Sequence, residues 1–391
     1  MSAKADTIPV TLLTGFLGAG KTTLLNRLVQ EPALSNSLVI INEFGSVGLD
    51  HDLVARSNED DTIVEMASGC LCCTIKGDLQ KTLKDAPWRY SREGKRWFDR
   101  VIIETTGLAD PAPIIHTVMA DENLISTYRL AEVLTLVDAV NGDATLDIQP
   151  EAVKQVAVAD TVLLSKTDIA EPNCAKALKG RLRAINRAAP IHEVAERHDD
   201  LMSLFGGSEF NPVIKGEQVL AWLRQEAYAG HDHHHHDHHH SHDHNHSHDN
   251  GHDHGHDHDV NRHDDRINSV GLTLDEPLPA EVFDEWFGLL TMLSGVNMLR
   301  VKGMIHIKGV DHPLVIHGVQ HIWHPPAMLP EWPCEDRRSR IVFILRDMEE
   351  SDLRKALSFV ADRYESAQLS GQPGLVRDGE NRSISHDATG I

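Results

Sequence analysis

Short apolar runs recur along the first half of the chain, and polar or glycine residues bound each of them. The run from Ile8 to Leu13 ends in a glycine-rich segment, and Thr22 to Gln30 after it has the pattern of a helix. Four similar runs follow, at residues 38–42, 101–104, 133–138 and 161–165. Buried strands that alternate with helices are typical of a mostly parallel sheet with helices on both faces. We therefore predict an α/β domain over residues 1–228.

The pattern changes beyond that domain. Residues 229–265 are nearly devoid of apolar side chains, so they cannot bury enough surface to offset their chain entropy, and we expect a disordered linker. A small α+β domain is predicted over residues 266–367, followed by a flexible tail over 368–391. Its expected strands lie at 269–274, 299–307, 314–319 and 340–345, and its expected helices at 280–293 and 351–364.

Composition narrows the class of protein. A length of 391 residues suits two domains, and a formal net charge of −22 argues against a nucleic-acid partner, whose phosphates would be repelled. The sequence contains no run of about eighteen apolar residues that would indicate a membrane span, and the first nine residues do not resemble a signal peptide. Three of the five cysteines are nearly contiguous, which disfavours a disulfide framework. A cytoplasmic protein with free thiols is expected.

A phosphate-binding loop lies between the first predicted strand and the first predicted helix. The segment from Gly15 to Thr22 has the spacing Gly-x-x-x-x-Gly-Lys-Thr, in the structural context that this motif needs. Lys21 would bridge the β- and γ-phosphates, and Thr22 would ligate Mg²⁺. A chance glycine-rich turn is the alternative. The residues expected to hold the nucleotide here are Gly15, Gly18, Ala19, Gly20, Lys21, Thr22 and Thr23.

Two further segments add to this nucleotide site. The strand at 101–104 ends in Glu104, a carboxylate suited to position Mg²⁺ or water, and Gly107 would approach the γ-phosphate. A core strand with an acidic end is the alternative. We expect Lys21, Thr22 and Glu104 to be the catalytic residues.

The segment from Ser165 to Asp168 resembles the guanine-reading motif Asn-Lys-x-Asp. Asp168 would accept hydrogen bonds from N1–H and the exocyclic amine of guanine, and the stem of Lys166 would lie over the ring. Adenine lacks this pair of donors, so the segment favours GTP over ATP; a solvated turn is the alternative. Serine in place of asparagine removes an amide that would brace the loop.

The cysteines Cys70, Cys72 and Cys73 predict a metal site. Thiolates are soft ligands suited to Zn²⁺, and a tetrahedral site needs four ligands, so we expect Glu43 and His116 to be the additional candidates. Three buried structural cysteines are the alternative. Residues 231–258 contain sixteen histidines and six aspartates, a composition suited to a capture arm for Zn²⁺, Ni²⁺ or Co²⁺.

Together these features resemble the CobW/YjiA branch of the P-loop GTPases, which is related to UreG and HypB. The resemblance rests on the phosphate-binding loop, on the guanine and cysteine motifs, and on residues 42–45, 104–107 and 299–306. It implies a GTPase that binds Zn²⁺ or Co²⁺ and passes it to a client metalloprotein, with the GTP or GDP state gating the transfer. Serine at the first position of the guanine motif also occurs in that branch.

The leading hypothesis is therefore a GTP-hydrolysing zinc metallochaperone that serves zinc homeostasis. Cobalt delivery to cobalamin biosynthesis, activation of a metalloenzyme, passive metal storage and a P-loop kinase are the alternatives. The client, the physiological metal and a homo-oligomeric state are left open by the sequence.

Overall fold

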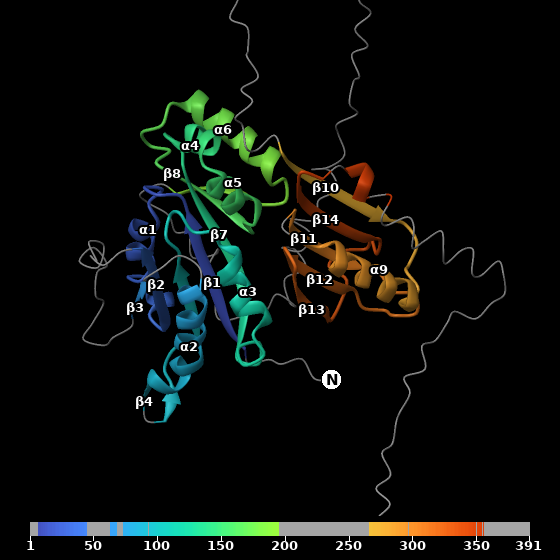
Figure 1. Ribbon diagram of the computed structural model, residues 1–391, viewed down its shortest axis with the longest axis horizontal. Helices are drawn as coiled ribbons and strands as arrows, with labels where there is room; N and C mark the ends of the chain where they lie inside the picture. The colour runs from blue at the N-terminus through green and yellow to red at the C-terminus, as the bar shows by residue number, and fades with distance from the viewer. Residues whose placement is uncertain are drawn as a thin grey trace, which may run out of the picture.

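The computed structural model describes residues 7–44, 63–68, 73–92, 94–194, 266–295, 297–348, 350–353 and 355. These residues form two domains, each built on one sheet (Figure 1). The predicted linker at 229–265 and the tail at 368–391 lie outside the described residues, as does most of the helix predicted at 351–364, of which 351–353 and 355 are helical. None of the described helices is long and apolar enough to span a membrane.

The first domain contains seven described strands in the order β3-β2-β6-β1-β7-β8-β9. Every neighbouring pair is parallel, so all carboxyl ends meet at one edge of the sheet. The strands are β1 (Ile8–Gly15), β2 (Ser37–Phe44), β3 (Ile63–Ser68), β6 (Arg100–Glu104), β7 (Tyr128–Asp138), β8 (Thr161–Ser165) and β9 (Ile191–Val194). A separate hairpin consists of β4 (Ser91–Arg92) and β5 (Lys95–Arg96).

Helices cover both faces of this sheet because its side chains alternate between two cores. Val10 and Leu12 of β1 pack with α2 and α3, whereas Leu13 packs with α1 on the opposite face. The helices are α1 (Lys21–Leu28), α2 (Cys73–Arg89), α3 (Ala112–Ala120), α4 (Gly142–Ile148), α5 (Pro150–Ala157) and α6 (Pro172–Ile185), with a 3₁₀ turn at Pro32–Leu34. The predicted α/β architecture is confirmed, although the sequence pattern did not identify β3 or β9.

The second domain is an antiparallel sheet with the strand order β10-β14-β11-β12-β13. Helix α9 (Ala280–Leu293) packs Phe283, Trp286 and Leu290 against it. The strands are β10 (Ile267–Leu274), β11 (Met298–Ile305), β12 (Leu314–Val319), β13 (Ile322–Met328) and β14 (Ser339–Arg346). We did not predict β13, which contains Pro325 and Pro326; it pairs on one side only, where strand prolines are tolerated.

The two domains pack closely against each other through α3, α5 and α6 of the first domain (Figure 1). Leu299 and Ile344 of the second domain share an apolar core with Val153 and Val156 of α5. Val319, at the end of β12, joins the core around α3. The second domain therefore rests on three of the helices that cover the parallel sheet.

Candidate nucleotide and metal site

The phosphate-binding loop connects β1 to α1 at the carboxyl edge of the sheet. Gly15 has φ 142° and Gly20 has φ 95°, a region that side chains rarely adopt. A Cβ atom at Gly15 would also lie 2.4 Å from the carbonyl oxygen of Leu136 on β7. Glycine is therefore required where β1 turns toward the helix.

Lys21 begins α1 and is largely buried beneath the loop. Its Nζ donates hydrogen bonds to the carbonyl oxygens of Gly15 (2.9 Å) and Phe16 (3.1 Å). An ammonium group held at the amino end of a helix, beside backbone N–H groups, provides the charge that a phosphate group needs. The loop thus holds the Lys21 ammonium group at the amino end of α1, and its role toward a phosphate stays a prediction.

Thr22 and Glu104 meet beside this loop. The Thr22 hydroxyl donates to Oε1 of Glu104 at 2.9 Å, although 82 residues separate them in sequence. Glu104 ends β6 directly beside Leu13 of β1, which explains the contact. A hydroxyl and a carboxylate are hard oxygen ligands, so this pair fits Mg²⁺.

The segment after Glu104 lies against the phosphate-binding loop. The Thr105 hydroxyl donates to the Thr14 hydroxyl (2.8 Å), and the Thr105 N–H donates to the Leu13 carbonyl (3.0 Å). A Cβ atom on Gly107 would lie 2.5 Å from the backbone nitrogen of Leu17, so only glycine fits there. The backbone of Gly107 therefore adjoins the phosphate-binding loop, and its approach to the γ-phosphate stays a prediction.

Serine at position 165 lacks the amide of the standard guanine motif, but its hydroxyl braces the phosphate-binding loop. The Ser165 hydroxyl donates to the carbonyl oxygen of Ala19 at 2.7 Å, and it also lies 3.3 Å from the carbonyl oxygen of Val137. The Ser165 side chain is buried and short, yet it reaches the Ala19 carbonyl because β8 ends close to the phosphate-binding loop. A hydroxyl thus braces the loop at the position where the standard motif has an amide.

Lys166 adopts a left-handed backbone conformation (φ 57°) and forms an ion pair with Asp138 at 2.7 Å. Burial raises the pKa of Asp138, but hydrogen bonds from Lys166, Asn141 and Val140 outweigh this effect and hold it below its ordinary value. Asp168 is exposed on the turn that follows. Asp138 was missed by the sequence analysis, although it ends a predicted strand just as Glu104 does.

Part of the predicted metal site lies outside the described residues, including Cys70, Cys72 and the histidine-rich tract. Backbone register nevertheless places Glu43 of β2 opposite Ala67 of β3, three residues before Cys70. The backbone of Cys73 begins α2. Among the described residues, no three His, Cys, Asp or Glu side chains form a metal-binding group.

His116, a candidate ligand from the sequence, contacts the second domain instead. Its Nε2 lies 3.0 Å from the carbonyl oxygen of Val319, and its ring packs edge-to-face on His321 with 4.6 Å between centroids.

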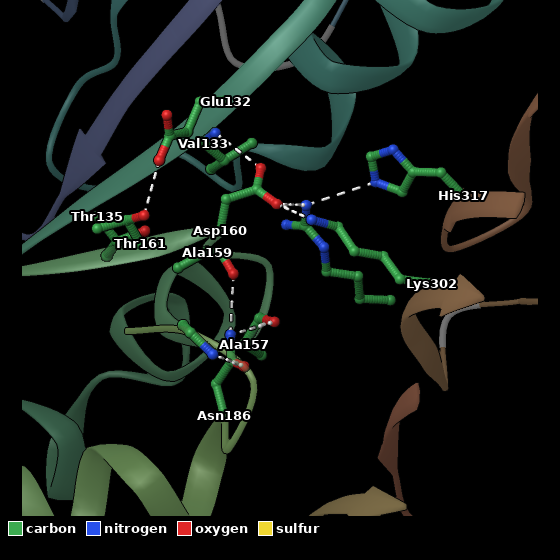
Figure 2. Close-up of polar contacts among 12 residues, drawn as sticks. Glu132, Val133, Thr135, Ala157, Ala159, Asp160, Thr161, Asn186, Lys302 and His317 are labelled. Carbon is green, nitrogen blue, oxygen red and sulfur yellow. Dashed lines mark hydrogen bonds and ion pairs between the residues drawn. The ribbon is translucent and has the colours of Figure 1, made fainter. Parts of the chain in front are cut away.

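A second polar group, the Asp160 cluster (Asp160, Arg300, Lys302 and His317), joins the two domains (Figure 2). Asp160 precedes β8 and accepts hydrogen bonds from Arg300 (2.5 Å), from Lys302 and from the backbone N–H of Val133 (2.9 Å). His317 lies 3.4 Å from Arg300.

These neighbours shift the titration of the Asp160 cluster. Burial raises the pKa of Asp160, but Arg300 and Lys302 hold it well below its ordinary value. Burial lowers the pKa of Lys302 to about 8, against the attraction of Asp160. Burial and the positive charges of Arg300 and Lys302 keep the pKa of His317 well below its ordinary value. At neutral pH the cluster therefore contains a carboxylate, two cations and a neutral imidazole.

Two family models match this chain. Residues 9–193 match the nucleotide-binding domain of CobW/HypB/UreG, and residues 267–360 match the C-terminal domain of the cobalamin synthesis protein cobW. The chain is 33% identical over 351 residues to the zinc chaperone YjiA of Escherichia coli, a match that covers 90% of this chain and 98% of YjiA. It is 27% identical over 392 residues to the zinc chaperone CobW of Sinorhizobium sp., covering 91% and 98% respectively.

A shorter match joins this chain to a eukaryotic protein. The zinc-regulated GTPase metalloprotein activator 1 of Schizosaccharomyces pombe is 34% identical over 205 residues, which cover 51% of this chain and 49% of that protein. Among solved structures, Zn(II)-bound YjiA GTPase from E. coli has a TM-score of 0.60 at 28% identity, with 91% of this chain and 99% of that chain covered. The predicted fold and family are confirmed. The chain belongs to the CobW/HypB/UreG family and combines its nucleotide-binding domain with a CobW C-terminal domain.

Proposed function

We propose that this chain is a GTP-hydrolysing metallochaperone that binds Zn²⁺ as cargo at Cys70, Cys72, Cys73 and Glu43 and delivers it to a client metalloprotein. The order of strand ends along the carboxyl edge of the sheet carries the proposal. β3 leads to the cysteines, β2 carries Glu43, β6 ends in Glu104, and β1 leads into the phosphate-binding loop. The strand that precedes the cysteines and the strand that precedes the nucleotide loop are therefore separated by two strands that both bear carboxylates.

The geometry around the loop supports hydrolysis of a nucleoside triphosphate. Lys21 would neutralise charge on the β- and γ-phosphates, and the backbone of Gly107 would approach the γ-phosphate beside Leu17. Thr22 and Glu104 would hold Mg²⁺, which offsets phosphate charge when bound. Glu104 would also orient the attacking water. Because water is the acceptor, the products are GDP and inorganic phosphate.

The proposed gating of the cargo follows from shared elements. Glu43 lies two residues beyond Ile41, which pairs directly with Glu104 of β6. A change at the γ-phosphate that shifts Glu104 or the end of β2 would therefore alter one of the zinc ligands. Coupling of this kind is reciprocal, so Zn²⁺ would change the affinity for GTP by the same factor.

Zinc titrations test both parts of this proposal. We expect the chain with a non-hydrolysable GTP analogue and the chain with GDP to bind Zn²⁺ with different affinities, and Cys70→Ser with Cys72→Ser to abolish the tight site. Cys174→Ser is the matched control, because Cys174 is an exposed thiol on α6. Equal zinc affinities in the two nucleotide states would remove the gating, and unchanged affinity in the double serine variant would remove the site.

The identity of the nucleotide has its own test. Asp168→Asn exchanges an acceptor for a group that can donate, so affinity for GTP should fall while affinity for xanthosine triphosphate, which has a carbonyl in place of the amine, should rise. Binding of both nucleotides unchanged by Asp168→Asn would contradict guanine recognition at this turn.

The histidine-rich tract is proposed as a capture arm that supplies the cysteine site. Deletion of residues 231–258 is expected to lower the number of zinc ions bound per chain and to leave GTP turnover unchanged. Cobalt remains the alternative cargo, because imidazole and thiolate ligands accept both metals. Metal analysis of the chain after growth with defined zinc and cobalt supply distinguishes the two.

A further inference from the structure

We propose that Gln155 is a positioning residue for the GTPase reaction, which holds the turn from Gly107 to Ala109 and connects it to the second domain. The inference rests on the proposed function. Gln155 lies on α5 and is fully buried, at 0% exposure. Its Nε2 donates to the carbonyl oxygens of Gly107 (3.2 Å) and Ala109 (3.0 Å). Both hydrogens of the amide are therefore used to hold one turn.

The position of this turn controls the space for a γ-phosphate. Gly107 lies so close to Leu17 of the phosphate-binding loop that no side chain fits between them. A displacement of Gly107 therefore changes the wall of the phosphate site directly. α5 is a firm support for the turn, since the backbone carbonyl of Gln155 also accepts a hydrogen bond from Thr135 of β7 at 2.8 Å.

Two buried polar atoms beside this turn point to a second arrangement of it. Neither Oε1 of Gln155 nor Oγ1 of Thr106 has a hydrogen-bond partner among the described residues. Gln155 also lines a small cavity together with Phe16, Leu17 and Ala19 of the phosphate-binding loop. Buried oxygens without partners are uncommon and costly, so an arrangement of the turn that brings a donor to either atom would gain a hydrogen bond.

The other side of α5 connects the turn to the second domain. Val153 and Val156, which flank Gln155, pack in one core with Leu299 of β11 and Ile344 of β14. Lys154 adds a partly exposed ion pair to Asp110, just past the same turn, at 3.2 Å. A shift of the turn is thus passed through Gln155 to a helix that contacts both domains.

Nucleotide affinities of matched variants test the positioning role. Gln155→Met keeps the side chain's size and removes its hydrogen bonds. We expect it to lower the affinity for the GTP analogue about tenfold more than the affinity for GDP, and to lower kcat. Asn186→Leu is the control. Asn186 is an equally buried amide, but it bonds the carbonyls of Val156, Ala157 and Ala159 and does not contact the turn. In Asn186→Leu, the ratio of the affinity for the GTP analogue to the affinity for GDP should stay within about twofold of the ratio in the unmodified chain.

The outcomes separate this inference from the proposed function. An unmodified chain that binds no guanine nucleotide contradicts the proposed function. If that chain binds GTP but Gln155→Met and Asn186→Leu change the ratio equally, only the role of Gln155 is contradicted. If Gln155→Met does not fold, Gln155→Asn replaces it, because the shorter amide cannot reach both carbonyls, and the same ratio decides.

Amide hydrogen exchange tests the connection to the second domain. On adding the GTP analogue, peptides of β11 and β14 should change their protection in the unmodified chain and not in Gln155→Met. The absence of any change in the unmodified chain, or a full change in Gln155→Met, would overturn the connection.

Discussion

The two ends of β8 differ in how they use charge. At its carboxyl end, Ser165 contacts the phosphate-binding loop and Lys166 contacts Asp138. This region is open to solvent around Asp168. At its amino end, Asp160 is enclosed by Arg300 and Lys302 from the second domain, and its side chain keeps only 14% exposure. One end is arranged to receive a ligand, whereas the other has its counter-charges already in place.

This difference indicates which property each set of charges controls, ligand affinity or the free energy of unfolding. Polar groups that await a ligand contribute mainly to its affinity and less to the free energy of unfolding. Where charges are paired inside the fold, removal of one partner lowers the free energy of unfolding, because it leaves the others buried and uncompensated. Variants at the two ends should therefore be distinguishable by stability at one and nucleotide affinity at the other.

The largest effect is expected for Asp160→Ala. Removal of the carboxylate leaves Arg300 and Lys302 facing each other in a largely buried site, so the free energy of unfolding should fall by about 3 kcal/mol. Urea unfolding followed by tryptophan fluorescence measures this loss. Asp160→Leu combined with Arg300→Met and Lys302→Met should recover most of it, because no charge then remains buried. A loss below about 0.5 kcal/mol for Asp160→Ala, as at a surface site, would contradict the enclosure of the Asp160 cluster.

Lys21→Ala should give the converse result. A hydrogen bond to a charged group contributes about 1.5–3 kcal/mol, so the affinity for GTP is expected to fall roughly 10- to 100-fold by calorimetric titration. Stability should change less than in Asp160→Ala. Lys176→Ala, on an exposed part of α6, is the control and should bind GTP normally. Retention of full GTP affinity by Lys21→Ala would refute the assignment of this loop as the phosphate site.

These two ends also differ in how well the sequence predicts them. The nucleotide site could be predicted because its residues fall in short motifs at the ends of apolar strands. Asp138 could have been found by the rule that identified Glu104, an acid that ends a strand. The Asp160 cluster could not, because Asp160 and Arg300 lie 140 residues apart. Residues 299–306 carry a family resemblance, but they do not indicate which side chain Arg300 contacts.

The strands also divide into those that the sequence predicts and those that it does not. Strands with several consecutive buried residues, such as β1 and β8, were predicted, and they occupy the interior of the sheet. β9 has a single buried residue, Val194, and β13 has two prolines, so neither has the apolar pattern of a strand. Both are edge strands, positioned by the neighbours on which they pack. Gln155 was missed for a related reason, since its role depends on a turn 46 residues away.

A dependence of stability on pH distinguishes the buried end of β8. The folded chain keeps His317 neutral, because burial and the charges of Arg300 and Lys302 lower its pKa, whereas the unfolded chain binds a proton near pH 6.5. The free energy of unfolding should therefore fall as the pH drops below about 6.5, by up to about 1.4 kcal/mol per unit. Asp160, whose pKa is also lowered, stays charged in this range, and His324 is the remaining titratable neighbour.

The slope of stability against pH, measured by urea unfolding between pH 7 and 5, isolates this contribution. His317→Gln should flatten the slope, whereas His312→Gln, at an exposed position, should leave it unchanged. Identical slopes in the unmodified chain and in His317→Gln would show that the imidazole titrates normally in the fold.

The smallest effect is expected for Ser165→Ala, at the open end of β8. The lost hydrogen bond to the Ala19 carbonyl contributes about 1 kcal/mol, which corresponds to a roughly fivefold loss of nucleotide affinity. The affinities for GTP and GDP should fall equally, because this bond braces the phosphate-binding loop at Ala19 and involves no atom of the Gly107 turn. Thr167→Ala, two residues away, removes a hydroxyl without a partner among the described residues and serves as the control. If Ser165→Ala weakened GTP alone, the serine would sense the γ-phosphate, and the separation of roles between Ser165 and Gln155 would be wrong.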